Sequence, residues 1–132
     1  GRMMKLLTWQ QWFLVSLAMT GVRWCLVAWA VNNVWVLVAG QTLHAFSFAV
    51  MHAVSMRYIQ MFFPASMQAR GQALYSSVGF GLGGAIGAML SGLLWQPLGG
   101  TGVFMLAALV ASVALFIAWW GLRDSQHECN TR

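Results

Sequence analysis

No charged side chain interrupts residues 71–95, GQALYSSVGFGLGGAIGAMLSGLLW. A helix needs roughly 20 mostly apolar residues to cross the hydrocarbon core of a bilayer, so this stretch is long enough to span one. The sequence on both sides of this stretch is also poor in charged residues. Between Lys5 and Arg123 the only charged residues are Arg23, Arg57 and Arg70. The chain is 60% hydrophobic and 7% charged, whereas a soluble domain is about a quarter charged, so most of it is expected to lie in lipid.

The apolar sequence divides into four expected transmembrane helices, which predicts an all-α membrane protein. Asn32-Asn33 forms a polar turn, Pro64 ends a helix, and residues 96–100 (QPLGG) form a further turn. A polar cytoplasmic tail is expected over 123–132. The expected spans lie at about 9–30, 34–63, 71–95 and 102–122.

The basic residues orient these spans. Lys and Arg near helix ends favour the cytoplasmic face of a membrane. The first and third connections carry no charge, and four spans place all the charged flanks on one side. Both termini are therefore expected in the cytoplasm. The flanking residues are Arg2 and Lys5, Arg57 and Arg70, and Arg123 and Arg132.

The second span carries a polar stripe. Polar side chains facing lipid are costly, so such a stripe should face protein or water. His44 lies near the expected midplane, where transporters place substrate and proton sites, and imidazole titrates near neutrality. A cavity that conducts substrate or protons competes here with a simple hydrogen-bonded contact between helices. The candidate pathway residues are Gln41, His44, Phe48, His52 and Ser55, with Tyr58 continuing the stripe.

Small residues form a row along the third span. Gly79, Gly83, Gly87 and Ser91 repeat every four residues, and Gly84, Ala88 and Gly92 form a neighbouring row. Such patterns let two helix backbones approach closely. The row is interpreted as a packing face, either static or sliding, that requires a partner helix.

Arg23 lies well inside the first span. Placing Arg at the bilayer centre costs roughly 2.5–3.5 kcal/mol on insertion scales. The other spans contain no acidic residue to pair with it. Missing partner segments, backbone carbonyls or lipid headgroups are the alternatives for its partner.

Several classes of function are excluded or disfavoured. The basic residues lie at the ends and in one connection rather than on one face, so no nucleic acid is expected. Cys25 and Cys129 have no metal-ligand spacing and are expected to be free thiols. No paired carboxylates or phosphate-binding loop are present, so the chain is not expected to be an enzyme and no cofactor is expected. A haem anchor is disfavoured because both span histidines lie on one helix.

The second and third spans resemble the 3-phenylpropionic acid transporter family of the major facilitator superfamily, which is related to nucleoside/proton symporters. The segments that carry the resemblance are QTLHAFSF at 41–48 with His52, RYI at 57–59, RGQALYSS at 70–77, and the glycine-rich run to Trp95. The resemblance implies that the four spans are the last four of a twelve-helix fold. It further implies that the His-bearing helix lines the central cavity.

By the same resemblance, the expected function is proton-coupled uptake of a small aromatic carboxylate such as 3-phenylpropionate, at a bacterial inner membrane. Partners would be the bilayer, substrate and protons, together with missing N-terminal helices or a second chain. Gly1 is not a start residue, so the chain is interpreted as a fragment. An inactive truncated remnant and a self-contained four-helix dimeric transporter are the alternatives.

Overall fold

The computed structural model describes residues 7–30 and 32–129, with side chains as far as Leu122. Every regular element in these ranges is helical. Three helical stretches are long and apolar enough to cross a membrane, namely Trp9–Trp29, Val34–Phe62 and Ala65–Leu122. The prediction of an all-α protein with membrane-spanning character is confirmed at this level.

Short polar side chains define the starts of the first two helices. Thr8 and Gln11 form a capping box at the start of α1 (Trp9–Trp29), each side chain accepting a hydrogen bond from the other residue's backbone N–H. Asn33 caps α2 (Val34–Phe62) by accepting a hydrogen bond from the N–H of Trp35, at 3.0 Å. The polar turn at Asn32-Asn33 therefore satisfies backbone donors that would otherwise lack a partner.

Beyond α2 the chain turns at Pro64 and continues through a series of short helices into one long helix. The extended backbone of Phe63 ends α2, because a residue before proline is pushed away from helical geometry. The elements that follow are η2 (Ala65–Met67), α3 (Gln68–Ser76), the π-helical segment η3 (Ser77–Leu82) and α4 (Gly83–Cys129).

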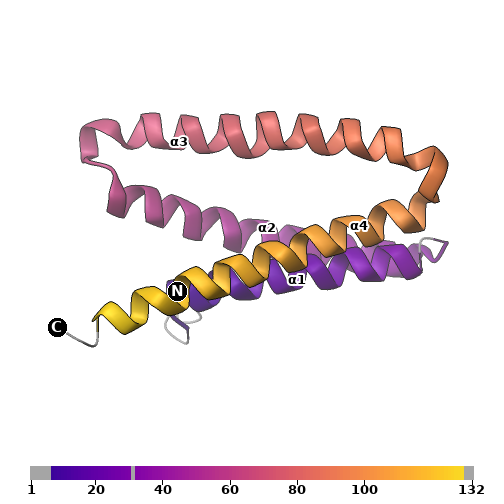
Figure 1. Cartoon of the computed structure of the whole chain (residues 1–132), viewed down its shortest axis with the longest axis horizontal. Helices are drawn as coiled ribbons and strands as arrows, with labels where there is room; N and C mark the ends of the chain where they lie inside the picture. Colours follow the sequence, from indigo (N-terminus) through magenta and orange to yellow (C-terminus); the bar gives the residue numbers. More distant parts are fainter. Residues whose placement is uncertain (1–6, 31, 130–132) are drawn as a thin grey trace.

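Helix α4 is broken at Gly99. This residue has φ 66° and ψ 173°, a conformation that glycine adopts far more easily than other residues. Pro97 precedes it and also opposes a continuous helix. We call residues 68–98 the glycine-rich arm and residues 100–129 the C-terminal arm. Figure 1 shows the chain reversing direction between them, and the break lies within the predicted turn at 96–100.

Helix α1 lies at the centre of the packing, in contact with both α2 and α4. Figure 1 shows the C-terminal arm running along α1, while the glycine-rich arm follows a separate course and rejoins the other helices at its two ends. The buried apolar side chains include Val27 of α1, Val54 of α2 and Ala108 of the C-terminal arm. Close packing is thus concentrated where these three helices meet.

Much of the outer surface is apolar. Trp29, Trp35 and Phe62 are 90%, 78% and 77% exposed, and every residue from Ser76 to Leu93 is exposed. Soluble monomers rarely expose continuous apolar surface on this scale. A hydrocarbon environment, in contrast, accommodates it at no cost.

Some predicted features at the chain ends can be placed only in part. Arg2, Lys5 and Arg132 lie outside the described residues, as do the side chains of Arg123 and Cys129. The backbone of α4 remains helical to Cys129, past Leu122, where the polar tail was expected to begin. The sequence after Leu122 contains no Gly or Pro before Cys129, so nothing in it stops the helix.

Candidate functional site

The predicted polar stripe lies on a side of α2 that α1 does not cover. The buried positions of α2 include Gly40, Ser47 and Val54. Ser47 satisfies its hydroxyl within the helix, donating to the carbonyl oxygen of His44 at 3.2 Å. The stripe itself is open or partly open: Gln41, His44 and Phe48 are exposed, whereas His52 and Ser55 are half-buried.

Three stripe residues form a ladder of rings along α2. The His44 and Phe48 ring centroids lie 5.8 Å apart, and those of Phe48 and His52 lie 6.1 Å apart with the rings nearly parallel, at 7°. Residues four apart on a helix are neighbours on its surface, which brings these rings together. Gln41 and Ser55 lie on the same side of α2, near the two ends of this ladder.

Two rings from the glycine-rich arm complete an aromatic cluster around His52. The centroid of Phe80 lies 5.5 Å from that of Phe48, and the centroid of Tyr75 lies 5.9 Å from that of His52. Tyr75 and Phe80 also meet edge to face, at 5.6 Å and 84°. We call His44, Phe48, His52, Tyr75 and Phe80 the His52 cluster.

The π-helical segment explains how Tyr75 and Phe80 lie together. They are five positions apart in the sequence, a spacing that points side chains in different directions from an α-helix. In η3 the N–H of Gly83 donates to the carbonyl of Val78, five residues back, and this wider turn brings the two rings to one side. Sequence reasoning did not assign either ring to the site. In the sequence, only their spacing of five positions, next to Gly79 and Gly81, indicated that the two rings could lie on one side of the helix.

His52 retains unused hydrogen-bonding capacity in this cluster. Its Nδ1 is buried and has no hydrogen-bond partner among the described residues. An unpaired buried polar atom costs roughly 1–3 kcal/mol and is uncommon in native structures. A half-buried imidazole surrounded by rings, with one nitrogen free, is chemically able to bind a ligand's polar group or to take up a proton.

The row of small residues faces open space. A Cβ atom added at Gly79 or Gly87 would meet nothing within 4 Å, leaving aside the surrounding helical backbone. Gly83, Gly87 and Ser91 line a groove of about 490 Å³ between the glycine-rich arm, α1 and the C-terminal arm. No helix within the described residues packs closely on this row, so its role in helix packing stays a prediction.

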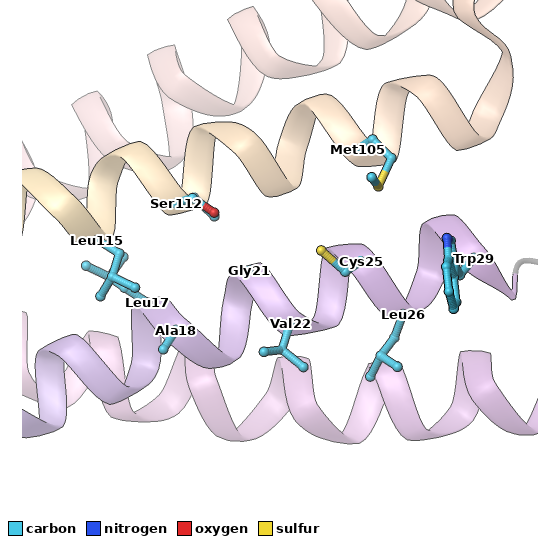
Figure 2. A pocket seen from close by; sticks show the side chains of 11 residues that line it. Leu17, Ala18, Gly21, Val22, Cys25, Leu26, Trp29, Met105, Ser112 and Leu115 are labelled. Carbon is cyan, nitrogen blue, oxygen red and sulfur yellow. The ribbon is translucent and has the colours of Figure 1, made fainter.

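A larger groove of about 670 Å³ lies between α1 and the C-terminal arm (Figure 2). Its lining includes Cys25, Trp29 and Met105 and is almost entirely apolar. Ser112 also lines it, but its hydroxyl donates to the carbonyl oxygen of Ala108, at 2.9 Å. This groove therefore offers little to a polar substrate, in contrast to the surroundings of His52.

Arg23 faces protein rather than lipid. It is only 7% exposed, and its guanidinium carbon lies 3.8 Å from the centroid of the Trp24 ring. Its stem lies beside Gly40: a Cβ added there would be in ordinary contact with Arg23 Cγ, at 3.9 Å, and tight only against a methyl of Val27, at 3.3 Å. The Nε atom is buried without a hydrogen-bond partner among the described residues.

The described residues hold no group of three or more His, Cys, Asp or Glu side chains that could bind a metal ion. The chemistry of the site therefore depends on imidazole, guanidinium, hydroxyl and aromatic groups. Such groups suit reversible binding of an organic molecule.

Comparison with known proteins identifies the family to which the chain belongs. A family model described as "MFS_1 like family" matches residues 1–117. The chain belongs to the MFS_1-like family. It is also similar to the Probable 3-phenylpropionic acid transporter of Escherichia coli (strain K12), with 39% identity over 104 residues. No solved structure gives a significant match.

The MFS_1-like membership agrees with the resemblance noted in the sequence and makes the chain a member of a transporter family, not of an enzyme family. The match covers 79% of this chain but only 27% of the Escherichia coli protein. The chain thus spans about a quarter of the length of this relative. Both the polar stripe and the row of small residues lie within the part that the family model covers.

Proposed function

We propose that this chain forms the C-terminal part of a secondary active transporter that takes up a small aromatic carboxylate together with protons. The observation that carries the proposal is the His52 cluster, in which a titratable imidazole with an unpaired Nδ1 lies against Phe48, Tyr75 and Phe80. The membership of a transporter family and the printed name of the relative support the substrate class.

In this proposal each component of the cluster has a physical role. Aromatic pairs contribute about 0.5–1.5 kcal/mol beyond the area they bury, so Phe48 and Phe80 would hold the ring of a substrate. His52 would take up a proton on one side of the membrane and release it on the other through its unpaired Nδ1. Gln41, His44 and Ser55 would supply further polar contacts along α2.

The proposed membrane arrangement has four crossings. Helix α1, helix α2 and the two arms are each long enough for one crossing, which needs roughly 20 residues. The stretch Ala65–Leu122 has 58 residues, far more than a single crossing needs. Arg57 and Arg70 flank the connection at Pro64 and favour its cytoplasmic location. Both termini would then be cytoplasmic, at a bacterial inner membrane, and the helices would correspond to the last four of twelve.

Proton-driven uptake tests this function. Membrane vesicles carrying the complete gene product should accumulate radiolabelled 3-phenylpropionate when an inward proton gradient is imposed, and a protonophore should abolish the accumulation. Vesicles from cells carrying the empty vector serve as the control. Verified membrane insertion with no uptake above this control would contradict the proposal, and accumulation that the protonophore does not change would contradict the proton coupling.

A second candidate is an inactive remnant of such a transporter. Membrane insertion without uptake in the vesicle experiment would favour this candidate. An upstream, in-frame run encoding eight further spans would contradict it. A four-helix dimeric transporter is disfavoured, because the spans contain no carboxylate for proton exchange.

A further inference from the structure

The aromatic rings of the His52 cluster are in contact with one another in this structure. The Phe48 and Phe80 centroids lie 5.5 Å apart, and the centroid of Phe80 lies 6.4 Å from that of His52. Aromatic pairs prefer centroid separations of about 4.5–7 Å, so a third ring between two others needs their centroids roughly 9 Å or more apart. The cluster is therefore closed to the ring of a substrate, and one of its own rings has to move to admit one.

Phe48 lies on a helix that is held by close packing. Its neighbour in the sequence, Ser47, is 2% exposed, and Val54 on the same helix is completely buried. Helix α2 is α-helical throughout and contacts α1 along its length. A movement of the backbone at Phe48 would disturb this contact.

Phe80, in contrast, lies on a segment that other helices among the described residues leave largely free. Every residue from Ser76 to Leu93 is exposed, and a Cβ atom added at Gly79 or Gly81 would meet nothing within 4 Å, leaving aside the surrounding helical backbone. The segment is also π-helical, a geometry that is rare and is often found at functional sites. The backbone at Phe80 is therefore the least constrained part of the cluster.

A change of η3 from π-helix to α-helix would carry Phe80 away from the cluster. Successive residues of an α-helix are rotated by about 100°, so side chains five positions apart point about 140° apart. In the structure Tyr75 and Phe80 instead meet edge to face at 5.6 Å, because the N–H of Gly83 donates to the carbonyl of Val78, five residues back. With Tyr75 in place, an α-helical turn would put Phe80 on a different side of the arm and uncover the rings of α2.

We propose that η3 is a gate of the substrate site. As a π-helix it places Phe80 against Phe48 and His52, and as an α-helix it opens the space over these two rings to the ring of the substrate. The inference rests on the proposed function and supplies a movement that this function requires, since Phe48 and Phe80 can hold a substrate ring only after they separate. Phe80 then packs on the free face of the bound ring.

Binding of 3-phenylpropionate to the complete gene product, purified in detergent, tests the gate through the variant Gly81→Ala. Gly81 belongs to neither row of small residues, and alanine favours the α-helix over glycine by an amount equivalent to roughly fivefold in an equilibrium constant. Because the structure has the closed form, a shift toward the open form should lower the apparent dissociation constant, by up to about fivefold.

Gly121→Ala is the matched control. It makes the same substitution in the C-terminal arm, where an added Cβ also meets nothing within 4 Å, and it should leave the dissociation constant unchanged. An unchanged or raised dissociation constant for Gly81→Ala would overturn the proposal.

Deletion of Val78 tests the closed form. It shortens the wide turn by one residue and leaves Tyr75 and Phe80 four positions apart, a spacing that keeps two side chains together on the surface of an α-helix. The gate should then stay closed, so the affinity for 3-phenylpropionate should fall by roughly tenfold or more. A deletion variant that binds the ligand as tightly as the wild type would contradict the gate.

Cross-linking reports the gate itself, without any ligand. In a background without the native cysteines, the pair Phe48→Cys and Phe80→Cys should be joined by a short bifunctional thiol reagent. Adding Gly81→Ala should lower the yield severalfold, whereas deletion of Val78 should preserve it and so show that the deleted protein keeps its fold. Equal yields with and without Gly81→Ala would overturn the proposal. If the wild type bound no 3-phenylpropionate, the proposed function would fail, and the cross-linking would still decide whether η3 changes its turn.

Discussion

At the scale of single residues, the free nitrogen of His52 is the feature with the clearest consequence. The imidazole stacks on Phe48 and touches Tyr75 and Phe80, yet its Nδ1 has no partner among the described residues. Such a group adds little to stability, because the ring contacts need no nitrogen. Its contribution, if the proposed function holds, is to binding or proton transfer.

The variant His52→Phe therefore distinguishes the role of the aromatic ring from the role of its nitrogen atoms. The phenyl ring keeps the stacking, so the unfolding temperature should not fall, and removing an unpaired buried polar atom can raise the unfolding free energy by up to about 1–3 kcal/mol. Proton-driven uptake of 3-phenylpropionate should fall by roughly an order of magnitude or more, as for the loss of a positioned acid or base. His52→Gln is the companion variant, which loses the ring but keeps polar atoms. Unchanged uptake by His52→Phe would refute the proton role.

At the scale of elements, the break at Gly99 determines where the two arms lie. One apolar stretch runs from Ala65 to Leu122, and the positive φ of Gly99 splits it into arms that run in opposite directions. The reversal places Trp95 beside Phe104. Together with η3, this bend determines which rings of the glycine-rich arm meet α2 and the C-terminal arm.

Substituting Gly99 tests this dependence. Gly99 has φ 66° and ψ 173°, a backbone conformation that essentially only glycine occupies and that costs another residue about 1–3 kcal/mol, so Gly99→Ala should lower the unfolding free energy by about that amount. Gly121→Ala is the control, since an added Cβ there meets nothing within 4 Å and alanine favours helix by about 1 kcal/mol over glycine. Thermal unfolding in detergent should therefore move in opposite directions for the two variants. A higher midpoint for Gly99→Ala would show that the bend does not need glycine.

At the scale of the whole molecule, the exposed apolar surface and the sparse charges favour a membrane location with one orientation. Arg57 and Arg70 flank the Pro64 connection, whereas the Asn32-Asn33 turn carries no charge. The two arginines should therefore keep the Pro64 connection on the cytoplasmic side of the membrane.

Cysteine labelling measures that orientation. In a background in which Cys25 and Cys129 are replaced by serine, Ser66→Cys should react with a membrane-impermeant maleimide only after the cells are opened. Asn32→Cys, in the opposite connection, should react in intact cells. The reverse pattern would overturn the proposed topology, and labelling of both sites in intact cells would contradict four crossings with cytoplasmic ends.

The candidate site was only partly predictable. The stripe from Gln41 to Ser55 follows from helical periodicity, and the structure brings His44, Phe48 and His52 into one ladder of rings. Tyr75 and Phe80 were missed, because their convergence depends on the wider turn of η3. The row of small residues was predicted to pack against a helix; Gly79 and Gly87 have open space beside them among the described residues, and the packing role stays a prediction.

The sequence by itself determined the helical, lipid-compatible character of the chain and the two ends of α2. These properties are local: apolar runs, the asparagine cap at Asn33, and Pro64 act through neighbouring residues. Only the tertiary structure decided that Tyr75 and Phe80 lie beside His52 and that Trp24 stacks on Phe104. The physical reason is that these contacts join distant segments, whose approach depends on the bend at Gly99, the wide turn of η3 and the packing of both neighbours on α1.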